Sequence, residues 1–261
     1  MSLSYQEFKD QVSQLCGIDL SFYKSKQLDR RIHSLMTLWR VNDYDNYLHI
    51  LKTTPRRYQE FLKKLTINVS EFFRNAESFV HLWEKVIPEL LKTQENLRIW
   101  SAGCAGGAEP YSIGIILKEL GAFHRADILA TDIDAQVLDR AGEAVYTANE
   151  VKSLPRELLA KYFREEKGYY YLSPEIKKIV RFQRHNLLLD PFALEFDLIV
   201  CRNVVIYFTE EVKNELYIRF NRALRMGGYL LVGGTEPLLN YKQLGFESVC
   251  YSFYKKVQDL N

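Results

Sequence analysis

Cysteine and histidine are scarce in this sequence, and neither residue type forms a cluster. The cysteines, Cys16, Cys104, Cys201 and Cys250, include no Cys-x-x-Cys pair, so the chain encodes neither a zinc cage nor a small disulfide scaffold. The five histidines are scattered, and none forms the i, i+4 pair of a helical metal site. We therefore expect reduced thiols and no metal centre.

Long apolar runs are also lacking. The best candidate, Phe196 to Phe208, is interrupted by Arg202 and Asn203, and it falls short of the ~20 residues that a membrane span needs. The segment Met1 to Glu7 lacks the basic stretch followed by apolar residues that a secretory signal requires. We expect a cytoplasmic protein with no membrane insertion.

Glycine and proline are too few for a fibrous or low-complexity protein, with 13 and 7 residues in a chain of 261. The 47% of hydrophobic and 26% of charged residues are typical of a globular protein. A chain of this length accommodates one large domain, or a main domain with a smaller one. We expect the second arrangement because the sequence pattern changes along the chain.

Residues 1–65 carry 11 Lys and Arg against 7 Asp and Glu, whereas the remaining residues carry 24 against 26. This front section has helical periodicity, with Leu28, Ile32, Leu35 and Trp39 on one face of a predicted helix. The opposite face is basic and includes Lys26, Arg30 and Arg40. We interpret residues 1–65 as a small helical domain whose basic face is either a solvated surface or a recognition surface.

From about residue 97 the pattern becomes short apolar runs that alternate with helical stretches, which predicts a largely parallel sheet covered by helices. The predicted strands are 97–101, 127–130, 180–183, 196–201, 229–233 and 249–255. Residues 66–96 are predicted to form a linker and a first helix, and 97–261 the α/β domain. Within it, residues 146–185 are expected to form a small antiparallel insertion.

The strongest local signal is the segment 97–112, where a predicted strand runs into the glycines 103, 106 and 107 and then into a helix expected to begin at Pro110. The next predicted strand is followed by Thr131 and Asp132, whose carboxylate can accept hydrogen bonds from both ribose hydroxyls of a nucleotide. Taken together, these features of one βαβ unit predict a site for an adenosine-containing ligand. The G-x-x-G-G order disfavours a nicotinamide-dependent dehydrogenase, whose loop is G-x-G-x-x-G.

Several segments, in order, resemble the chemotaxis receptor glutamate O-methyltransferases, the CheR family. They are Thr66-Ile-Asn-Val-Ser-Glu-Phe-Phe-Arg74, Cys104-Ala-Gly-Gly-Ala-Glu-Pro-Tyr-Ser112, Ala130-Thr-Asp-Ile-Asp134, His185-Asn-Leu187, Phe196-Asp-Leu-Ile-Val-Cys-Arg-Asn-Val-Val-Ile-Tyr-Phe208 and Gly233-Gly-Thr-Glu236. The resemblance covers nearly the whole chain. It implies a Rossmann-like class I methyltransferase domain of the α/β class, preceded by an all-α domain, with S-adenosylmethionine as cofactor and S-adenosylhomocysteine as product.

The resemblance also implies site residues. The cofactor would be bound by Asn68, Ser70, Arg74, Gly103, Glu109, Asp132, Asn186, Leu187, Arg202 and Asn203. Arg74 and Tyr207 match positions that orient the substrate beside the methyl group. Residue type alone favours structural roles instead: a surface or capping ion pair for Arg74, and a core aromatic residue with its hydroxyl at the rim for Tyr207.

One segment departs from the family. The family usually has Cys-Ser-Thr-Gly-Glu-Glu-Pro-Tyr, and here Ala105, Gly106 and Ala108 replace the Ser, the Thr and the first Glu. Glu109, the carboxylate expected to contact the ligand, is retained. Two hydroxyl groups are lost, which bears on cofactor affinity.

The family's substrates are glutamates on the cytoplasmic helical bundle of chemotaxis receptors, whose surface is acidic near the methylation sites. The resemblance therefore implies that Lys26, Arg30 and Arg40 form a receptor-recognition surface that steers the encounter. Two alternatives remain: a methyltransferase of the same lineage that acts on another signalling protein, and a regulatory module that only binds the cofactor. We expect a monomer, and no nucleic-acid binding, because the basic front lacks the denser basic and aromatic pattern of such surfaces.

Overall fold

The computed structural model describes residues 3–66, 70–250 and 252–260. The chain divides into two compact units. One contains Met1–Asn68 together with Tyr207–Lys213, and the other contains Val69–Ile206 together with Asn214–Asn261. We call them the helical unit and the sheet unit. The sequence analysis did not anticipate that Tyr207–Lys213 groups with the N-terminal helices, and its boundaries at residues 65 and 96 stay a prediction.

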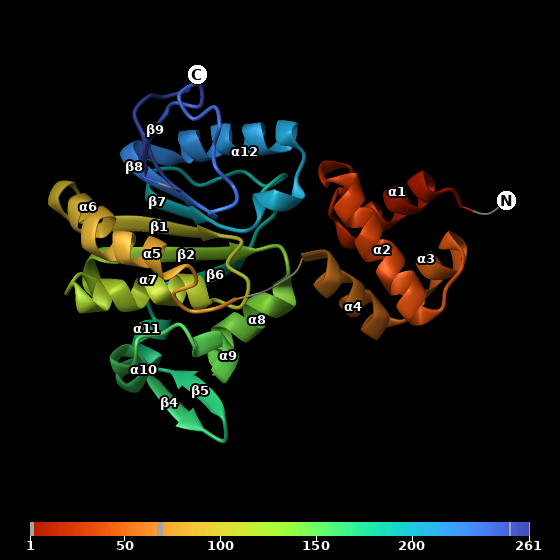
Figure 1. The fold of residues 1–261 in the computed structure, drawn as a ribbon, viewed down its shortest axis with the longest axis horizontal. Helices are drawn as coiled ribbons and strands as arrows, with labels where there is room; N and C mark the ends of the chain where they lie inside the picture. The colour runs from red at the N-terminus through yellow and green to blue at the C-terminus, as the bar shows by residue number, and fades with distance from the viewer. Residues whose placement is uncertain (1–2, 67–69, 251, 261) are drawn as a thin grey trace. The chain divides into compact units, whose positions relative to one another are not determined.

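The helical unit is built from amphipathic helices (Figure 1). Its elements are α1 (Tyr5–Cys16), a 3-10 turn η1 (Leu20–Phe22), α2 (Ser25–Trp39), α3 (Tyr44–Thr53) and α4 (Pro55–Thr66). Ser4 and Glu7 form a capping box at the start of α1, and Asp43 caps α3 by accepting from the backbone N–H of Asn46. Phe8 and Tyr47 stack at 5.1 Å between ring centroids, so a buried aromatic pair joins α1 to α3.

The sheet unit contains a seven-stranded sheet with the order β6-β2-β1-β7-β8-β10-β9. The strands are β1 (Leu97–Ala102), β2 (Ala126–Asp132), β6 (Val180–Arg184), β7 (Phe196–Cys201), β8 (Leu224–Val232), β9 (Phe246–Cys250) and β10 (Phe253–Lys256). The neighbours from β6 to β8 are parallel, whereas β10 is antiparallel to both β8 and β9. All six residues of β7 are buried, as expected for a central parallel strand covered on both faces.

Helices lie along this sheet (Figure 1). They are α5 (Ala76–His81), the π-helical turn η2 (Leu82–Val86), α6 (Ile87–Thr93), α7 (Ala108–Glu119), the 3-10 turn η3 (Phe123–Arg125), α8 (Ala135–Glu143) and α12 (Glu210–Ala223), with a 3-10 turn η4 (Val205–Tyr207) before α12. Both α7 and α8 pack against β2 and β6. Most of α7 is buried, including the segment 110–117, so the helix that follows the glycine-rich loop is fixed in the core.

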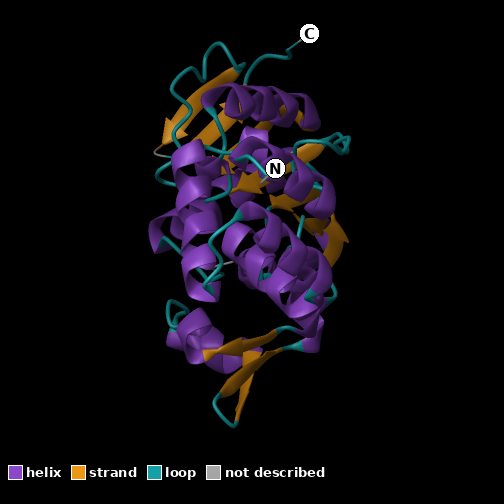
Figure 2. Cartoon of the chain, turned by 90° about the vertical axis from the view of Figure 1, so that its right-hand side faces the viewer, coloured by secondary structure: helices purple, strands orange, loops and turns teal. Residues whose placement is uncertain are grey.

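A second, three-stranded antiparallel sheet, with the order β3-β5-β4, lies apart from the large sheet (Figure 2). It comprises β3 (Val145–Thr147), β4 (Phe163–Glu166) and β5 (Tyr169–Leu172), accompanied by the short helices α9 (Ala148–Val151), α10 (Arg156–Tyr162) and α11 (Pro174–Lys177). The expected fold class is therefore confirmed: an α/β domain with a mostly parallel sheet, an all-α N-terminal part and a small antiparallel sheet.

Two expected elements were wrong in detail. The run 249–255 is not one strand, because β9 ends at Cys250, and β10 begins at Phe253 and pairs antiparallel with β9. The helix expected from Pro110 begins earlier, at Ala108, with Gly107 as its N-cap. The backbone N–H groups of a first helical turn have no intrahelical acceptor, so proline is tolerated inside that turn.

All four cysteines are free thiols, with Cys104 and Cys201 buried. Among the helices of the described residues, none is long and apolar enough to cross a membrane.

Candidate active site

The site lies where the sheet changes winding direction. β1 and β7 are neighbours, and the chain continues from β1 to β2 and β6 on one side and from β7 to β8 on the other. In doubly wound sheets, ligands bind beyond the carboxyl ends of the strands at this point. The loop 103–107 follows β1, and Arg202 and Asn203 follow β7.

The loop after β1 is shaped by two glycines. Gly103 has φ +85°, and a Cβ there would lie 2.4 Å from Cγ2 of Val204, so only glycine allows the loop after β1 to approach the loop after β7. Gly107 has φ +83° as the N-cap of α7. The loop is held from β2, because the N–H groups of Gly103 and Cys104 donate to the Thr131 carbonyl at 2.8 and 2.9 Å.

Glu109 and Arg202 form a buried ion pair at this edge. Oε1 of Glu109 accepts from the Ser101 hydroxyl at 2.8 Å, and Oε2 lies 3.4 Å from Nη1 of Arg202. The side chain of Arg202 is 3% exposed and that of Glu109 is 16% exposed. Burial raises the pKa of the Glu109 carboxyl above its ordinary value, and the Arg202 guanidinium opposes that rise. A carboxylate in the first turn of α7 suits a cationic ligand group.

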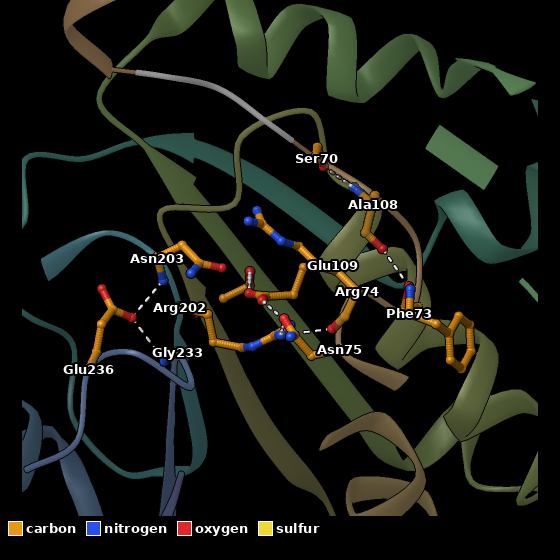
Figure 3. Close-up of polar contacts among 12 residues, drawn as sticks. Ser70, Phe73, Arg74, Asn75, Ala108, Glu109, Arg202, Asn203, Gly233 and Glu236 are labelled. Atoms are coloured by element: carbon orange, nitrogen blue, oxygen red, sulfur yellow. Dashed lines mark hydrogen bonds and ion pairs between the residues drawn. The ribbon is translucent and has the colours of Figure 1, made fainter. Parts of the chain in front are cut away.

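Arg202 also fixes the backbone of the segment before α5. Its Nη2 donates to the Arg74 carbonyl at 2.7 Å and to Oδ1 of Asn75 at 2.8 Å, and its guanidinium lies 5.3 Å from the Phe79 ring centroid. Figure 3 shows Arg74, Glu109, Arg202 and Asn203 gathered at the carboxyl edge of the strands. The positive charge of Arg74 also opposes the rise in the pKa of Glu109.

Ser70 and Phe73 attach the same segment to the start of α7. The N–H of Ala108 donates to the Ser70 hydroxyl at 3.2 Å, and the N–H of Phe73 donates to the Ser112 hydroxyl at 3.1 Å (Figure 3). The predicted cofactor residue Asn68 lies outside the described residues.

Asp132 ends β2 and lies beside the loop after β6. Its Oδ2 accepts from the N–H of Ala105 at 2.9 Å and its Oδ1 from that of Asp134 at 3.1 Å, while burial raises its pKa. The N–H of His185 donates to the Asp132 carbonyl at 2.9 Å, which brings Asn186 and Leu187 to the same edge. An ionised carboxylate has about four acceptor positions, so Asp132 retains capacity for ligand hydroxyls.

Glu236 is the main feature that the sequence analysis left without a role. This residue is 3% exposed. Its Oε2 accepts from the N–H groups of Asn203 and Gly233 at 2.6 and 2.9 Å (Figure 3). Its Oε1 accepts from the N–H of Ile206 at 3.0 Å. It therefore fixes the loop after β7, in which Asn203 has φ +60°. An acidic residue in the loop that follows the apolar strand β8 was the available signal.

The remaining predicted residues lie in the helical unit. Tyr207 groups with the N-terminal helices, and Lys26 and Arg30 are exposed on α2, with Arg40 exposed at its C-terminal end. In the described residues, no group of three His, Cys, Asp or Glu side chains is arranged to hold a metal ion.

The groups in the sheet unit fit a ligand with a ribose at one end and an amino acid at the other. The Asp132 carboxylate can accept from ribose hydroxyls, and the Glu109 carboxylate can accept from an ammonium group. Nε of Arg202 is buried and has no hydrogen-bond partner among the described residues, so the site retains an unsatisfied donor. These features fit S-adenosylmethionine.

Fold and site together define a Rossmann-like methyltransferase that uses S-adenosylmethionine. The family model described as "CheR methyltransferase, SAM binding domain" matches residues 68–251, and "CheR methyltransferase, all-alpha domain" matches residues 3–66. The chain belongs to the CheR methyltransferase family.

Curated relatives match over nearly their full length. A chemotaxis protein methyltransferase from Listeria innocua is 39% identical over 97% of this chain and 97% of its own length. The protein of the same name from Borreliella burgdorferi is 36% identical, over 95% of this chain and 94% of its own. The chain is a methyltransferase of chemotactic adaptation with S-adenosylmethionine as cofactor, as predicted.

Proposed function

We propose that this enzyme forms methyl esters on glutamate side chains of the cytoplasmic helical bundle of chemotaxis receptors, acting as a monomer in the cytoplasm. The observation that carries this proposal is the Arg202 contact with the Arg74 carbonyl at 2.7 Å, which holds the Arg74 backbone at the carboxyl edge of the strands. An arginine there can bind an acceptor carboxylate with two parallel hydrogen bonds.

The chemistry needs no base from the protein. Bound S-adenosylmethionine supplies a methyl group on a positively charged sulfur. A glutamate has an ordinary pKa of about 4.3, so its carboxylate is ionised at neutral pH and one oxygen can form the new C–O bond as the C–S bond breaks. No proton moves, and opposite charges cancel, so in-line positioning in a water-poor site supplies most of the rate.

In this proposal Arg74 and Tyr207 are the residues that orient the acceptor carboxylate, Arg74 through its guanidinium and Tyr207 through its hydroxyl. The cofactor would be held by Asn68, Ser70, Arg74, Gly103, Glu109, Asp132, Asn186, Leu187, Arg202 and Asn203. Glu109 would accept from the ammonium group of its amino acid end, and Asp132 from the ribose.

The basic face of α2 would bind the receptor. Lys26 and Arg30 are exposed and four residues apart, so they share one face of the helix, and Arg40 follows at its end. Reversing both charges with Lys26→Glu and Arg30→Glu should lower receptor methylation about tenfold at low salt without changing the Kd for S-adenosylhomocysteine. The matched control is Lys52→Glu with Arg56→Glu, the same charge change on exposed residues of the same unit. Unchanged methylation by the α2 variant would contradict this role.

The direct test uses a labelled methyl group on S-adenosylmethionine and receptor-containing membranes from the same organism. Mild alkali should release labelled methanol from the receptor band, because carboxyl methyl esters hydrolyse under these conditions. Absence of label, with S-adenosylhomocysteine binding intact, would contradict the proposed acceptor and favour another signalling protein or a role as a cofactor-binding regulator.

A further inference from the structure

The segment Tyr207–Lys213 belongs to the helical unit, although the chain on both sides of it belongs to the sheet unit. Its backbone pairs with the segment before α2. The N–H of Lys24 donates to the Tyr207 carbonyl at 2.8 Å, and the N–H of Thr209 donates to the Phe22 carbonyl at 3.0 Å. Tyr23 and Phe208 form an isolated antiparallel bridge between these bonds.

Side chains reinforce this pairing. The rings of Tyr23 and Phe208 meet edge to face with centroids 5.4 Å apart, and Nζ of Lys24 lies 3.4 Å from Oε1 of Glu210. Phe208 is 5% exposed, so the segment is seated in the core of the helical unit. The backbone position of Tyr207 is therefore set by residues that precede α2.

The Tyr207 ring has its own partner on α2. The guanidinium of Arg31 lies 4.4 Å from the centroid of the Tyr207 ring, within the range of a cation–π contact. Arg31 is 8% exposed, and its Nη1 donates to the Leu65 carbonyl at 2.6 Å, near the end of α4. A planar guanidinium can stack with its flat face on a ring and donate from its edge at the same time, whereas the ammonium of lysine has no flat face to stack.

We infer that Arg31 is a positioning residue that fixes the Tyr207 ring, and so its hydroxyl, for the methyl-transfer step. The inference rests on the proposed role of Tyr207 in orienting the acceptor carboxylate. Arg30, the next residue on the same helix, is exposed on the proposed receptor surface. The helix that would meet the receptor therefore also carries the residue that holds Tyr207 in place.

The test compares Arg31→Lys in two backgrounds. Lysine keeps the positive charge and can still donate to the Leu65 carbonyl, so the fold is preserved while the stacking is lost. In the wild-type background we expect kcat for receptor methylation to fall about tenfold, with KM for receptor and Kd for S-adenosylhomocysteine unchanged within about twofold. Arg56→Lys, on the exposed surface of α4, is the matched control and should leave kcat unchanged.

The second background is Tyr207→Phe, which keeps the ring under Arg31 and removes only the hydroxyl. If Arg31 acts through that hydroxyl, adding Arg31→Lys should lower kcat less than about twofold further. An equal tenfold loss in both backgrounds, or a parallel loss of cofactor affinity, would overturn the inference. A wild-type enzyme without receptor methylation would instead contradict the proposed function, so the two failures are distinguishable.

Discussion

Arg31 and Arg202 are buried arginines, one in each unit, and they differ in what balances their charge. Arg202 faces the Glu109 carboxylate and also donates to the Arg74 carbonyl. Arg31 contacts the Leu65 carbonyl and the Tyr207 ring, and within the described residues no carboxylate lies in salt-bridge distance of it. Arg202 thus has a carboxylate and a carbonyl as partners, whereas Arg31 has a carbonyl and an aromatic ring.

Each arginine donates to a backbone carbonyl near the point in the sequence where the helical unit ends and the sheet unit begins. Arg31 donates to the Leu65 carbonyl in the helical unit, and Arg202 donates to the Arg74 carbonyl in the sheet unit. In the roles proposed above, Arg202 supports cofactor binding and Arg31 supports turnover, so the two functions should be separable by mutation. The following predictions test that separation, starting from the largest expected effect.

Removing the Arg202 charge should damage the sheet unit most. Arg202→Met leaves the buried Glu109 carboxylate without its cation and the Arg74 carbonyl without its donor. We expect the free energy of unfolding to fall by ~3–5 kcal/mol and cofactor binding to be lost. Thermal unfolding and S-adenosylhomocysteine titration measure both effects, with the exposed Arg164→Met as control. A Tm equal to that of the control would contradict the role given to this ion pair.

Arg74→Ala should separate the structural contribution of the Arg74 backbone from the proposed catalytic contribution of its side chain. Arg202 binds the Arg74 carbonyl, which the substitution retains, so the fold should lose less than ~1 kcal/mol. The guanidinium that would orient the acceptor is removed, so kcat should fall at least about a hundredfold. Single-turnover methyl transfer and thermal unfolding measure the two quantities. A large fall in Tm would indicate a structural residue instead.

Glu236→Gln tests the loop that carries Arg202 and Asn203. One of the two carboxylate oxygens becomes an N–H₂ group, which cannot accept from the backbone N–H groups of the loop. We expect a loss of ~1–3 kcal/mol in stability and about tenfold in affinity for S-adenosylhomocysteine. Glu247→Gln, an exposed substitution on β9, should change neither. Calorimetric titration at neutral pH would decide, and unchanged affinity would exclude this positioning role.

The smallest expected effect is a pH dependence that arises from Glu109. Burial raises the pKa of its carboxyl. In the proposed role, the ionised form is the one that would accept from the ligand ammonium group. Affinity for S-adenosylhomocysteine should therefore be full above that raised pKa and fall severalfold as the pH drops through it. Glu109→Gln should bind more weakly, with a flat profile over the same range. A wild-type profile as flat as that of the variant would contradict the assignment.

The sequence predicted the parts of the site that depend on local chain chemistry. Glycines at 103 and 107 adopt positive φ, and Asp132 ends its strand as expected. The contact of Arg31 with Tyr207 was not predicted, because it joins residues far apart in the chain and neither residue type specifies a partner. Glu236 was quoted as part of a motif, but its three backbone donors come from two separate loops, which only the folded sheet brings together.

The most direct test of whether cofactor binding and turnover depend on different arginines compares two variants, Arg31→Lys and Arg202→Lys. For each variant, kcat for receptor methylation and Kd for S-adenosylhomocysteine are measured in parallel. We expect Arg202→Lys to weaken the Kd at least about tenfold, because lysine cannot reproduce its several directed hydrogen bonds. Arg31→Lys should lower kcat about tenfold and leave the Kd unchanged. Equal losses of cofactor affinity in the two variants would contradict the account.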